Sequence, residues 1–460
     1  MYFRQILHED LGCASYFIAD RDEAAVIDPK WDIDDYLRIA REAGAAIRHV
    51  LETHHHADHV SGRGRLATAT GAAVYVPADL AETGSPGLRD GDVVRVGDVS
   101  LRAVAASGHR PEHLAFLVSD STRLPDQPCL LLSGDSLLIG DVARPDLAVA
   151  AEEGASALFD TLARFEALAD HVELWPAHVG GSLCGSGSLS PKPSSTIGYE
   201  RLANPLLTVP TREAFIAELT RTAPPRPPTV ERVVALNQDA TRAPDDPQEL
   251  DIAGLRELIA DGGCVLDVRA PDRFDAGHLK GALSLPLGGR GLGTRAGWAV
   301  GLEDPIVIVA ATLEAAKRVA ILLHAAGLWN VEGVAAADPA AWVGAGLSVR
   351  TATALAPDSP RLVAGEWRLL DVRDPSEWDA GHIDPSLHLP LSALGDGRGV
   401  GLPGGRPLAV ACAAGNRAAL AASVLRRRGY PEVARVVGGV HDLARHGAAW
   451  VNGTDDIVVR

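Results

Sequence analysis

A cluster of metal-binding side chains lies near the N-terminus of the sequence. The stretch HVLETHHHADHVSG, residues 49–62, begins in a short apolar run and contains five of them: His54, His55, His56, Asp58 and His59. On an extended loop alternate residues share a side, so we expect His54 and His56 to face one point. Asp58 and His59 then follow on the next turn. Imidazole and carboxylate ligands suit zinc or non-haem iron, so the stretch predicts a metal site.

Three more candidate ligands follow later in the chain. They are His109 in SGHRPEH, Asp135 in LLSGDSLLIGD and His178 in WPAHVGG. Each comes just after an apolar run, where a strand would end and a site would form. A single histidine is more often structural than ligating. The pattern HxHxDH followed in order by GH, GD and AH is far more specific, and it favours a metal centre.

The five cysteines do not belong to this pattern. They are scattered, odd in number and never in a CxxC pair: Cys13, Cys129, Cys184, Cys264 and Cys412. Such a distribution is typical of a reducing cytosol, and it predicts neither a disulfide framework nor a cysteine-built metal site. We therefore expect no thiolate among the metal ligands.

The ligand pattern closely resembles the metallo-β-lactamase superfamily over roughly residues 1–210. The resemblance implies an αββα sandwich with the metal site at one edge. In the dinuclear hydrolases of the glyoxalase II type, one metal ion would have His54, His56 and His109. The other would have Asp58, His59 and His178, and Asp135 would bridge them while a shared hydroxide attacks a thioester.

A second branch of the superfamily, the persulfide dioxygenases, uses the same positions differently. In that branch His54, His109 and Asp135 would hold one Fe(2+) ion, and His56, Asp58, His59 and His178 would surround it and orient water and ligands. The stretches GHRPEHLAF, SGDSLLIGDVARPDL, PAHVGGSLCGSG and STIGYERLANPLL resemble this branch, in particular its bacterial fusions with rhodanese modules. Cys184 is a candidate for the substrate entrance or, equally, for a small buried thiol.

The second half of the chain contains an internal repeat. CVLDVRAPDRFDAGHLKGALSLPL aligns with RLLDVRDPSEWDAGHIDPSLHLPL 104 positions later. Five residues recur at this spacing: Asp267, Arg269, Gly277, His278 and Pro286 become Asp371, Arg373, Gly381, His382 and Pro390. Each copy continues as strand, loop, Ala-rich helix, Gly and strand, which indicates a duplicated α/β unit. We interpret the shared Asp, Arg and His residues as structural.

The second copy contains VACAAGNRAALAA, in which C-x-x-G-x-R follows an apolar strand. This stretch resembles the active-site loop of rhodaneses. A loop that winds into a helix start directs backbone N–H groups and the positive end of the helix dipole at Cys412, which stabilises an anionic persulfide. Gly415 permits the tight curl, and Arg417 would meet an anionic donor such as thiosulfate. Gly415 and Asn416 are the candidate substrate-binding residues.

The first copy departs from this pattern. VAATLEAAKR stands opposite the active loop, with Ala310 in the cysteine position and neither the loop glycine nor the loop arginine. Cys264 precedes the LDVR strand and is in the wrong place to substitute. We expect this copy to be catalytically inactive and to serve as a spacer or docking surface.

The whole chain suits a multidomain protein. Proline-rich stretches at 221–229, 241–249 and 351–361 indicate three domains. They are a metallo-β-lactamase-like domain with a C-terminal extension over 1–240, a degenerate rhodanese domain over 246–350 and a rhodanese domain with Cys412 over 356–460, both α/β with parallel sheets. The net charge of −17 argues against nucleic acid. We expect a cytoplasmic protein without membrane contact, because the N-terminus lacks an apolar signal core and no apolar run reaches ~18 residues.

The two resemblances together predict one function. A persulfide dioxygenase oxidises the outer sulfur of a thiol persulfide with O2 to sulfite, and a rhodanese exchanges sulfane sulfur between thiosulfate, sulfite and thiols. One module's product is therefore the other's substrate, as in sulfide detoxification. We expect Fe(2+), small thiol persulfides, O2 and sulfite or thiosulfate as cofactor and partners, and a homo-oligomer as usual for the resembled family. A dinuclear enzyme with two Zn(2+) and thioester substrates remains the alternative, and the thiol carrier, glutathione or coenzyme A, stays open.

Overall fold

The computed structural model divides the chain into two compact units. The first comprises Met1–Arg226 and Val230–Ala243, and the second comprises Pro227–Thr229 and Pro244–Arg460. The structure describes residues 1–8, 10–81, 86–125, 127–180, 189–221, 225–239, 241–395, 401–402 and 405–452. Cys184, a candidate for the substrate entrance or for a small buried thiol, lies outside these ranges. Among the described helices, none combines the length and the apolar character needed to cross a membrane.

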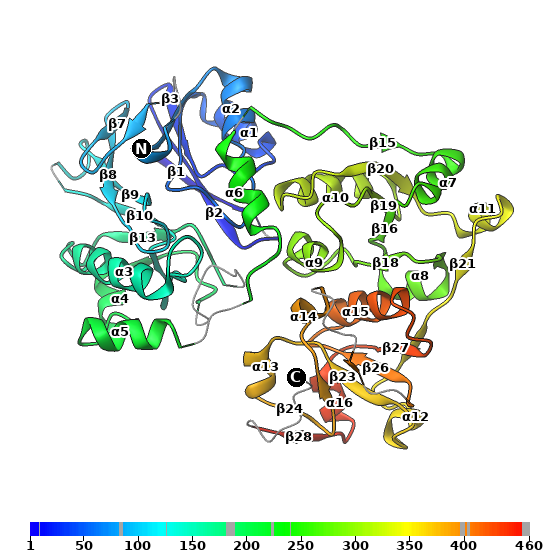
Figure 1. Ribbon diagram of the computed structural model, residues 1–460. Helices are drawn as coiled ribbons and strands as arrows, with labels where there is room; N and C mark the ends of the chain where they lie inside the picture. The colour runs from blue at the N-terminus through cyan, green and yellow to red at the C-terminus, as the bar shows by residue number, and fades with distance from the viewer. Residues whose placement is uncertain are drawn as a thin grey trace. The chain divides into compact units, whose positions relative to one another are not determined.

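Two six-stranded sheets form the first unit (Figure 1). The first sheet has the order β1 (Tyr2–His8), β2 (Cys13–Asp20), β3 (Glu23–Ile27), β4 (Ala46–Leu51), β5 (Ala73–Pro77) and β6 (Gly87–Leu88). The second has the order β14 (Ser195–Thr196), β13 (Glu173–Pro176), β10 (Leu130–Gly134), β9 (Leu114–Asp120), β8 (Val99–Ala105) and β7 (Val93–Val96). Short additional elements are η1 (Ala78–Leu80), β11 (Leu137–Leu138) and β12 (Asp141–Val142).

One apolar core fills the space between these sheets, and helices cover their outer faces. Tyr16 and Ile18 of β2 share a buried cluster with Leu101 and Phe116 of the second sheet. The outer face of the first sheet packs on α1 (Asp34–Ala43) and α2 (Arg63–Thr70). The outer face of the second packs on α3 (Ala151–Glu166), α4 (Ile197–Ala203) and α5 (Arg212–Leu219). Both faces of the central strands are therefore buried, and the predicted αββα sandwich is confirmed.

Two parallel sheets form the second unit, one for each copy of the repeat. The first has the order β15 (Gln248–Glu249), β20 (Val331–Ala336), β19 (Ile306–Ala310), β16 (Cys264–Asp267) and β18 (Leu283–Ser284). The second has the order β22 (Thr353–Leu355), β27 (Val433–Val436), β26 (Leu408–Ala411), β23 (Arg368–Asp371) and β25 (Leu387–His388). Equivalent strands occupy equivalent places, so the predicted duplicated α/β fold is confirmed.

Helices and short antiparallel pairs complete each copy. The first copy contains α7 (Ile252–Ala260), α8 (Pro271–Ala276), α9 (Leu292–Ala299), α10 (Leu313–Ala325), α11 (Pro339–Gly344) and the pair β17 (His278–Leu279) with β21 (Val349–Arg350). The second contains α12 (Pro360–Val363), α13 (Pro375–Asp379), α14 (Leu391–Gly395), α15 (Asn416–Arg427), α16 (Val440–Arg445) and the pair β24 (His382–Asp384) with β28 (Ala449–Val451).

The shared Asp and Arg residues of the repeat have structural roles. Arg373 forms hydrogen bonds to both carboxylate oxygens of Asp371 and to the carbonyl oxygen of Gly381. Arg269 makes the same contacts with Asp267 and Gly277 in the first copy. Each arginine therefore ties the end of a central strand to the loop after the following helix.

The two copies share one hydrophobic core. A single buried cluster contains Leu266 and Leu323 of the first copy together with Leu370 and Leu425 of the second. The backbone N–H of Ser284 also donates to the Ser423 hydroxyl, at 2.9 Å. The first copy therefore packs directly against the second, and the separate limits 246–350 and 356–460 stay predictions.

Candidate functional site

Each predicted metal ligand of the first unit lies in the loop after a strand. His54 follows β4, His109 follows β8, Asp135 follows β10 and His178 follows β13. All four side chains are buried. The expectation that the ligands gather where strands end is confirmed by this arrangement.

His54, His109 and Asp135 form a closed group. The Nε2 atom of His109 lies 3.4 Å from Oδ2 of Asp135, and Nε2 of His54 lies 3.8 Å from the same oxygen. One donor atom from each residue lies within 4.8 Å of the others. Two imidazoles and one carboxylate form the ligand set that leaves several coordination positions open on non-haem iron.

His54 and His109 each form a hydrogen bond through Nδ1 to a residue outside the group, and this bond leaves Nε2 facing the group. His109 Nδ1 lies 3.0 Å from the carbonyl oxygen of Arg144, which only accepts, so Nδ1 carries the hydrogen. The Thr53 hydroxyl donates to Asp28, so it accepts from Nδ1 of His54, at 2.9 Å. The Nε2 lone pairs of His54 and His109 are therefore available to bind a metal ion. In metal sites, a hydrogen bond at the other ring nitrogen usually orients a ligating histidine in this way.

Charge states also suit a metal ion. Burial lowers the pKa of His54 well below its ordinary value, with His56 as a further cause, and burial likewise lowers the pKa of His109. Burial would raise the pKa of Asp135, but His178 outweighs it and the pKa is lowered. Among the described residues, Nε2 of His54 and both carboxylate oxygens of Asp135 have no hydrogen-bond partner. Such buried atoms are costly unless a ligand satisfies them, so this group fits a metal ion.

His56 belongs to a different set of contacts. Its Nε2 lies 3.2 Å from Oδ1 of Asp28 and 3.4 Å from Oε2 of Glu52. Burial alone would lower the pKa of His56, but these two carboxylates raise it well above its ordinary value. The Nδ1 atom of His56 has no hydrogen-bond partner among the described residues, and the His56 ring centroid lies 4.3 Å from that of His54, so the expectation that His54 and His56 face one point stays a prediction. The local spacing of the histidines does not reveal these two buried carboxylates.

The predicted sulfur-transfer loop follows β26 in the second unit. The Cys412 sulfur accepts hydrogen bonds from the backbone N–H groups of Gly415, at 3.0 Å, and Ala418, at 3.4 Å. Gly415 has φ 96°, a conformation that favours glycine, and helix α15 begins directly after it. The loop therefore surrounds the sulfur with donors at a helix N-terminus, which suits an anionic sulfur.

The strand registers identify the equivalent position in the first copy. Asp371 pairs with Ala411, and its counterpart Asp267 pairs with Val309. The next residues, Cys412 and Ala310, therefore occupy the same place in the two copies. The first copy has no thiol there, in agreement with the prediction that it is inactive.

Arg417 and Asn416 have partners that the sequence did not indicate. The Arg417 guanidinium contacts both carboxylate oxygens of Glu377, at 2.5 and 2.8 Å, and Oδ2 of Asp374 at 3.1 Å. Nδ2 of Asn416 donates to the carbonyl oxygen of Gly288 in the first copy, at 2.8 Å. The first copy thus helps to hold the start of α15. Under the predicted sulfur-transfer role, an anionic donor would compete with Glu377 for Arg417.

Comparisons with known proteins agree with both halves of this geometry. The Metallo-beta-lactamase superfamily profile matches residues 8–178, and the Rhodanese-like domain profile matches residues 251–335 and 360–446. The hydroxyacylglutathione hydrolase of Rhodobacter capsulatus is 30% identical over 200 residues, which cover 43% of this chain and 70% of that protein. The chain belongs to the metallo-beta-lactamase superfamily, fused to two rhodanese-like domains.

A persulfide dioxygenase and a solved metallo-beta-lactamase are also similar to this metallo-beta-lactamase–rhodanese fusion. The mitochondrial persulfide dioxygenase of Bos taurus is 26% identical over 240 residues, 51% of this chain and 86% of that protein. A solved metallo-beta-lactamase from Staphylococcus aureus subsp. aureus COL has a TM-score of 0.65 at 28% identity. It covers 73% of this chain and 98% of that one, so the likeness extends beyond the metallo-beta-lactamase region.

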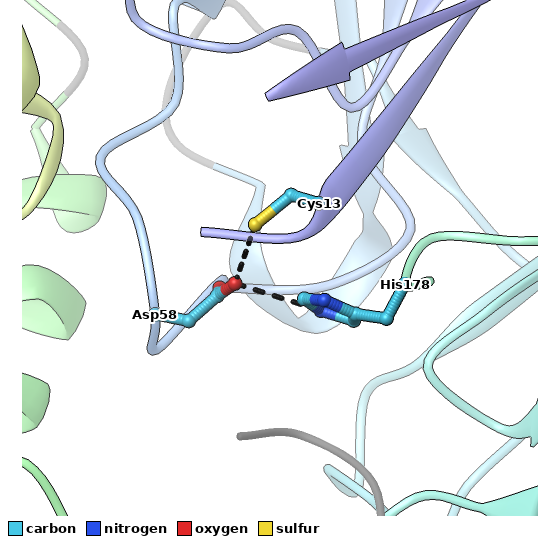
Figure 2. A group of neighbouring side chains, drawn as sticks. All are labelled: Cys13, Asp58 and His178. Atoms are coloured by element: carbon cyan, nitrogen blue, oxygen red, sulfur yellow. Dashed lines mark hydrogen bonds and ion pairs between the residues drawn. The ribbon is translucent and has the colours of Figure 1, made fainter. Parts of the chain in front are cut away.

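Cys13 lies beside the candidate metal ligands of the fusion, a neighbour that the sequence analysis did not indicate. Its thiol donates to Oδ2 of Asp58 at 2.8 Å, and the same oxygen lies 3.5 Å from Nε2 of His178 (Figure 2). Burial, and then the Asp58 carboxylate, raise the pKa of Cys13 well above its ordinary value. No spacing signal in the sequence connects Cys13 with the histidines, because 45 residues separate it from Asp58.

His59 supports Asp58 from the other side. Its Nδ1 lies 3.1 Å from Oδ1 of Asp58, and the structure groups it with Asp58 and His56. His178 lies instead with Cys13 and Asp58, and its Nε2 is 3.1 Å from Oδ2 of Asp135. The predicted second-metal set of Asp58, His59 and His178 is thus divided between two groups in this structure, and its role as a set stays a prediction.

Asn237 is a second residue that the sequence analysis missed. It lies in α6 (Val230–Gln238), and its side-chain Nδ2 donates to the carbonyl oxygens of His56 and His59, both at 2.9 Å. Its Oδ1 accepts from the backbone N–H of Ser61 at 2.8 Å. The Asn237 side chain therefore fixes the backbone of the loop that carries the metal-binding histidines.

We expect Asn237→Ala to weaken metal binding as well as folding. Three buried loop groups lose their partner, which costs about 2–4 kcal/mol in the free energy of unfolding. Metal affinity falls by about 10-fold or more, since supporting partners of ligands contribute at this level. Competition with a chromogenic chelator measures the affinity, and urea unfolding measures the stability.

Asn204→Ala is the matched control for this experiment. Asn204 is also buried, and its Nδ2 donates to the carbonyl oxygen of Asp141 at 3.0 Å, outside the histidine loop. Both variants should lose stability, but Asn204→Ala should keep its metal affinity. Equal affinities in the two variants would show that Asn237 has no special link to the metal loop.

The contacts of Arg417 lead to a prediction about the rhodanese loop. Glu377→Gln removes the negative charge that contacts Arg417, so the guanidinium becomes more available to an anionic substrate. We expect the KM for thiosulfate to fall by about 3- to 10-fold, which corresponds to roughly 1 kcal/mol. Steady-state cyanide–thiosulfate assays at two salt concentrations measure it. Glu366→Gln, at an exposed Glu366–Arg361 pair, is the control, and an increased KM in Glu377→Gln would contradict the prediction.

Proposed function

We propose that this protein is a persulfide dioxygenase coupled to sulfur transfer. It would oxidise the sulfane sulfur of low-molecular-weight thiol persulfides with O2 to sulfite, and so contribute to sulfide detoxification. One observation carries the proposal: His54, His109 and Asp135 form a buried two-histidine, one-carboxylate group in the same chain as a rhodanese-like loop at Cys412. Two histidines and one carboxylate suit a mononuclear Fe(2+) site, and the rhodanese-like loop would use its product.

The residues of the first unit would prepare this chemistry. Bound Fe(2+) would supply a centre at which an anionic sulfur and dioxygen can react. Arg144 and Thr53 fix the ring orientation of His109 and His54, and burial keeps both imidazoles neutral. The buried surroundings also exclude bulk water, which protects a reactive sulfur species from side reactions.

The second unit would process the product. Sulfite attacks the outer sulfur of a Cys412 persulfide, so a new S–S bond forms, thiosulfate leaves, and the Cys412 thiolate remains. The backbone N–H groups of Gly415 and Ala418 stabilise that thiolate. In the reverse direction, thiosulfate loads Cys412 and a small thiol collects the sulfur as a new persulfide. Under this proposal, a rhodanese loop in the same chain as a persulfide-consuming centre would use the product of that centre.

A dinuclear zinc thioester hydrolase is the second candidate. It is favoured by the 30% identity to a bacterial hydroxyacylglutathione hydrolase and by the closeness of His178 to Asp135. A hydrolase of that kind has no evident use for the sulfur-transfer loop at Cys412. We therefore prefer the dioxygenase.

Oxygen consumption distinguishes the two candidates. The full chain, loaded anaerobically with Fe(2+), should take up O2 when glutathione persulfide or coenzyme A persulfide is added, with sulfite and thiosulfate as products. The more active of the two persulfides identifies the thiol carrier. Hydrolysis of S-lactoylglutathione by the Zn(2+)-loaded chain, without O2 uptake by the iron form, would assign the protein to the hydrolases.

A further inference from the structure

The loop 286–290 of the first copy lies against the start of α15 in the second copy. Nδ2 of Asn416 donates to the carbonyl oxygen of Gly288 at 2.8 Å. A Cβ atom added at Gly289 would lie 3.1 Å from the same Nδ2 atom, so the main chain of both glycines passes close to Asn416. The residue before Asn416 donates its backbone N–H to the Cys412 sulfur at 3.0 Å. The first copy therefore contributes to the surroundings of Cys412.

A buried guanidinium fixes the shape of this loop. Nη1 of Arg295, in α9, donates to the carbonyl oxygen of Arg290 at 2.8 Å. Its Nη2 atom donates to the carbonyl oxygens of Pro286 and Gly288, both at 3.3 Å. The Gly288 carbonyl thus accepts from Arg295 of the first copy and from Asn416 of the second. The main chain of the loop is therefore held in one place beside the start of α15.

Arg417, the predicted partner of the anionic donor, is already paired with carboxylates. Its guanidinium contacts Glu377 at 2.5 Å and Asp374 at 3.1 Å. Glu377 alone balances the charge of Arg417, and Asp374 adds further negative charge. Thiosulfate carries two negative charges, so its binding beside Cys412 calls for another cation.

We propose that Arg290 supplies this cation and binds the sulfur oxyanion, thiosulfate or sulfite, that exchanges sulfur with Cys412. Arg290 is exposed, and a guanidinium presents a planar fork of donors that suits an oxyanion. Arg290 lies two residues after Gly288, at most about 7 Å along the main chain. An extended arginine side chain can therefore reach an anion at the start of α15. The proposal rests on the proposed sulfur-transfer role of Cys412, and it gives the first copy a share in substrate binding.

Binding of thiosulfate to the full chain tests the proposal without turnover. Isothermal titration calorimetry gives the Kd of thiosulfate in a Cys412→Ser chain, with and without Arg290→Gln. We expect Arg290→Gln to raise the Kd by about 5- to 10-fold, and the difference to shrink in about 0.5 M NaCl, which screens exposed charges. Arg290→Lys, which keeps the charge, should recover most of the affinity. Equal Kd values, or no thiosulfate binding to the Cys412→Ser chain, would overturn the proposal.

Arg256→Gln is the matched control for the loss of charge. Arg256 is also an exposed arginine of the first copy, in α7. This helix packs through Leu255 on the face of the sheet that carries Val307, whereas Ile308 faces the core shared with the second copy. Arg256→Gln should leave the Kd unchanged, and an equal loss of affinity in both variants would overturn the role of Arg290. Thermal unfolding should be unaffected in Arg290→Gln, because Arg295 contacts only the main-chain carbonyl of Arg290.

Steady-state sulfur transfer from thiosulfate to cyanide separates this proposal from the proposed function. If the wild type is active, Arg290→Gln should raise the KM for thiosulfate by a similar factor and leave kcat within about twofold, as expected when only binding is lost. Normal turnover with an unchanged KM would refute the role of Arg290 alone. An inactive wild type, combined with thiosulfate binding that weakens in Arg290→Gln, would refute the sulfur-transfer function and leave the binding site in place.

Discussion

Replacing His109 by alanine should abolish persulfide-dependent oxygen uptake and release the metal ion. His109 contributes a buried neutral imidazole whose Nε2 lies 3.4 Å from the Asp135 carboxylate. Removal leaves two protein ligands, and an unfilled cavity where the ring was. Since even supporting partners of ligands change metal affinity by 10- to 100-fold, we expect a loss of more than about 100-fold here. Metal content after dialysis and O2 uptake measure the two effects.

Two further histidine variants test whether His109 is itself a metal ligand. Nε2 of His113 accepts the backbone N–H of Asp135 at 3.0 Å, and burial lowers the pKa of His113 to about 3, so the ring is neutral. His113→Ala should cost metal affinity about 10-fold, because it supports a ligand without being one. The exposed His171→Ala should have no effect. Equal loss of metal in His113→Ala and His109→Ala would contradict the assignment of His109 as a ligand.

Cys412→Ser should abolish sulfur transfer and leave the dioxygenase reaction intact. Serine keeps the size of the side chain but cannot form a persulfide, so thiosulfate–cyanide sulfurtransferase activity should fall by at least about 1,000-fold. In a reaction with glutathione persulfide and O2, thiosulfate should give way to sulfite while O2 uptake continues. Ion chromatography of the products, with an oxygen electrode, measures both.

Cys264→Ser is the matched control for the thiol. Cys264 is buried in the first copy, and its sulfur accepts from Arg427 at 2.8 Å. Burial raises the pKa of this thiol, as expected for an unreactive one. Both activities should survive in Cys264→Ser. Thiosulfate formation that persists in Cys412→Ser but fails in Cys264→Ser would move the sulfur carrier to the first copy.

Local sequence was sufficient for the architecture and for the ligand types. The HxHxDH motif, GH, GD and AH all follow apolar runs, and the structure places each of them in the loop after a strand. The repeat spacing identified two α/β copies and located Ala310 opposite Cys412, as the strand registers confirm. These features are local because a strand end and its loop lie within a few residues of one another.

Tertiary structure decided how the side chains divide into sites. His56 turns toward Asp28 and Glu52, Cys13 reaches Asp58 across 45 residues, and Asn237 reaches the carbonyl oxygen of His56 across 181. None of these contacts follows from periodicity, because each depends on a strand register, a helix docking position or a side-chain rotamer set by distant packing. The sequence by itself therefore determined which ligands are available and where the sulfur-transfer cysteine lies. Only the folded structure determined that the Cys13 thiol contacts Asp58 and that the Asn237 amide holds the histidine loop.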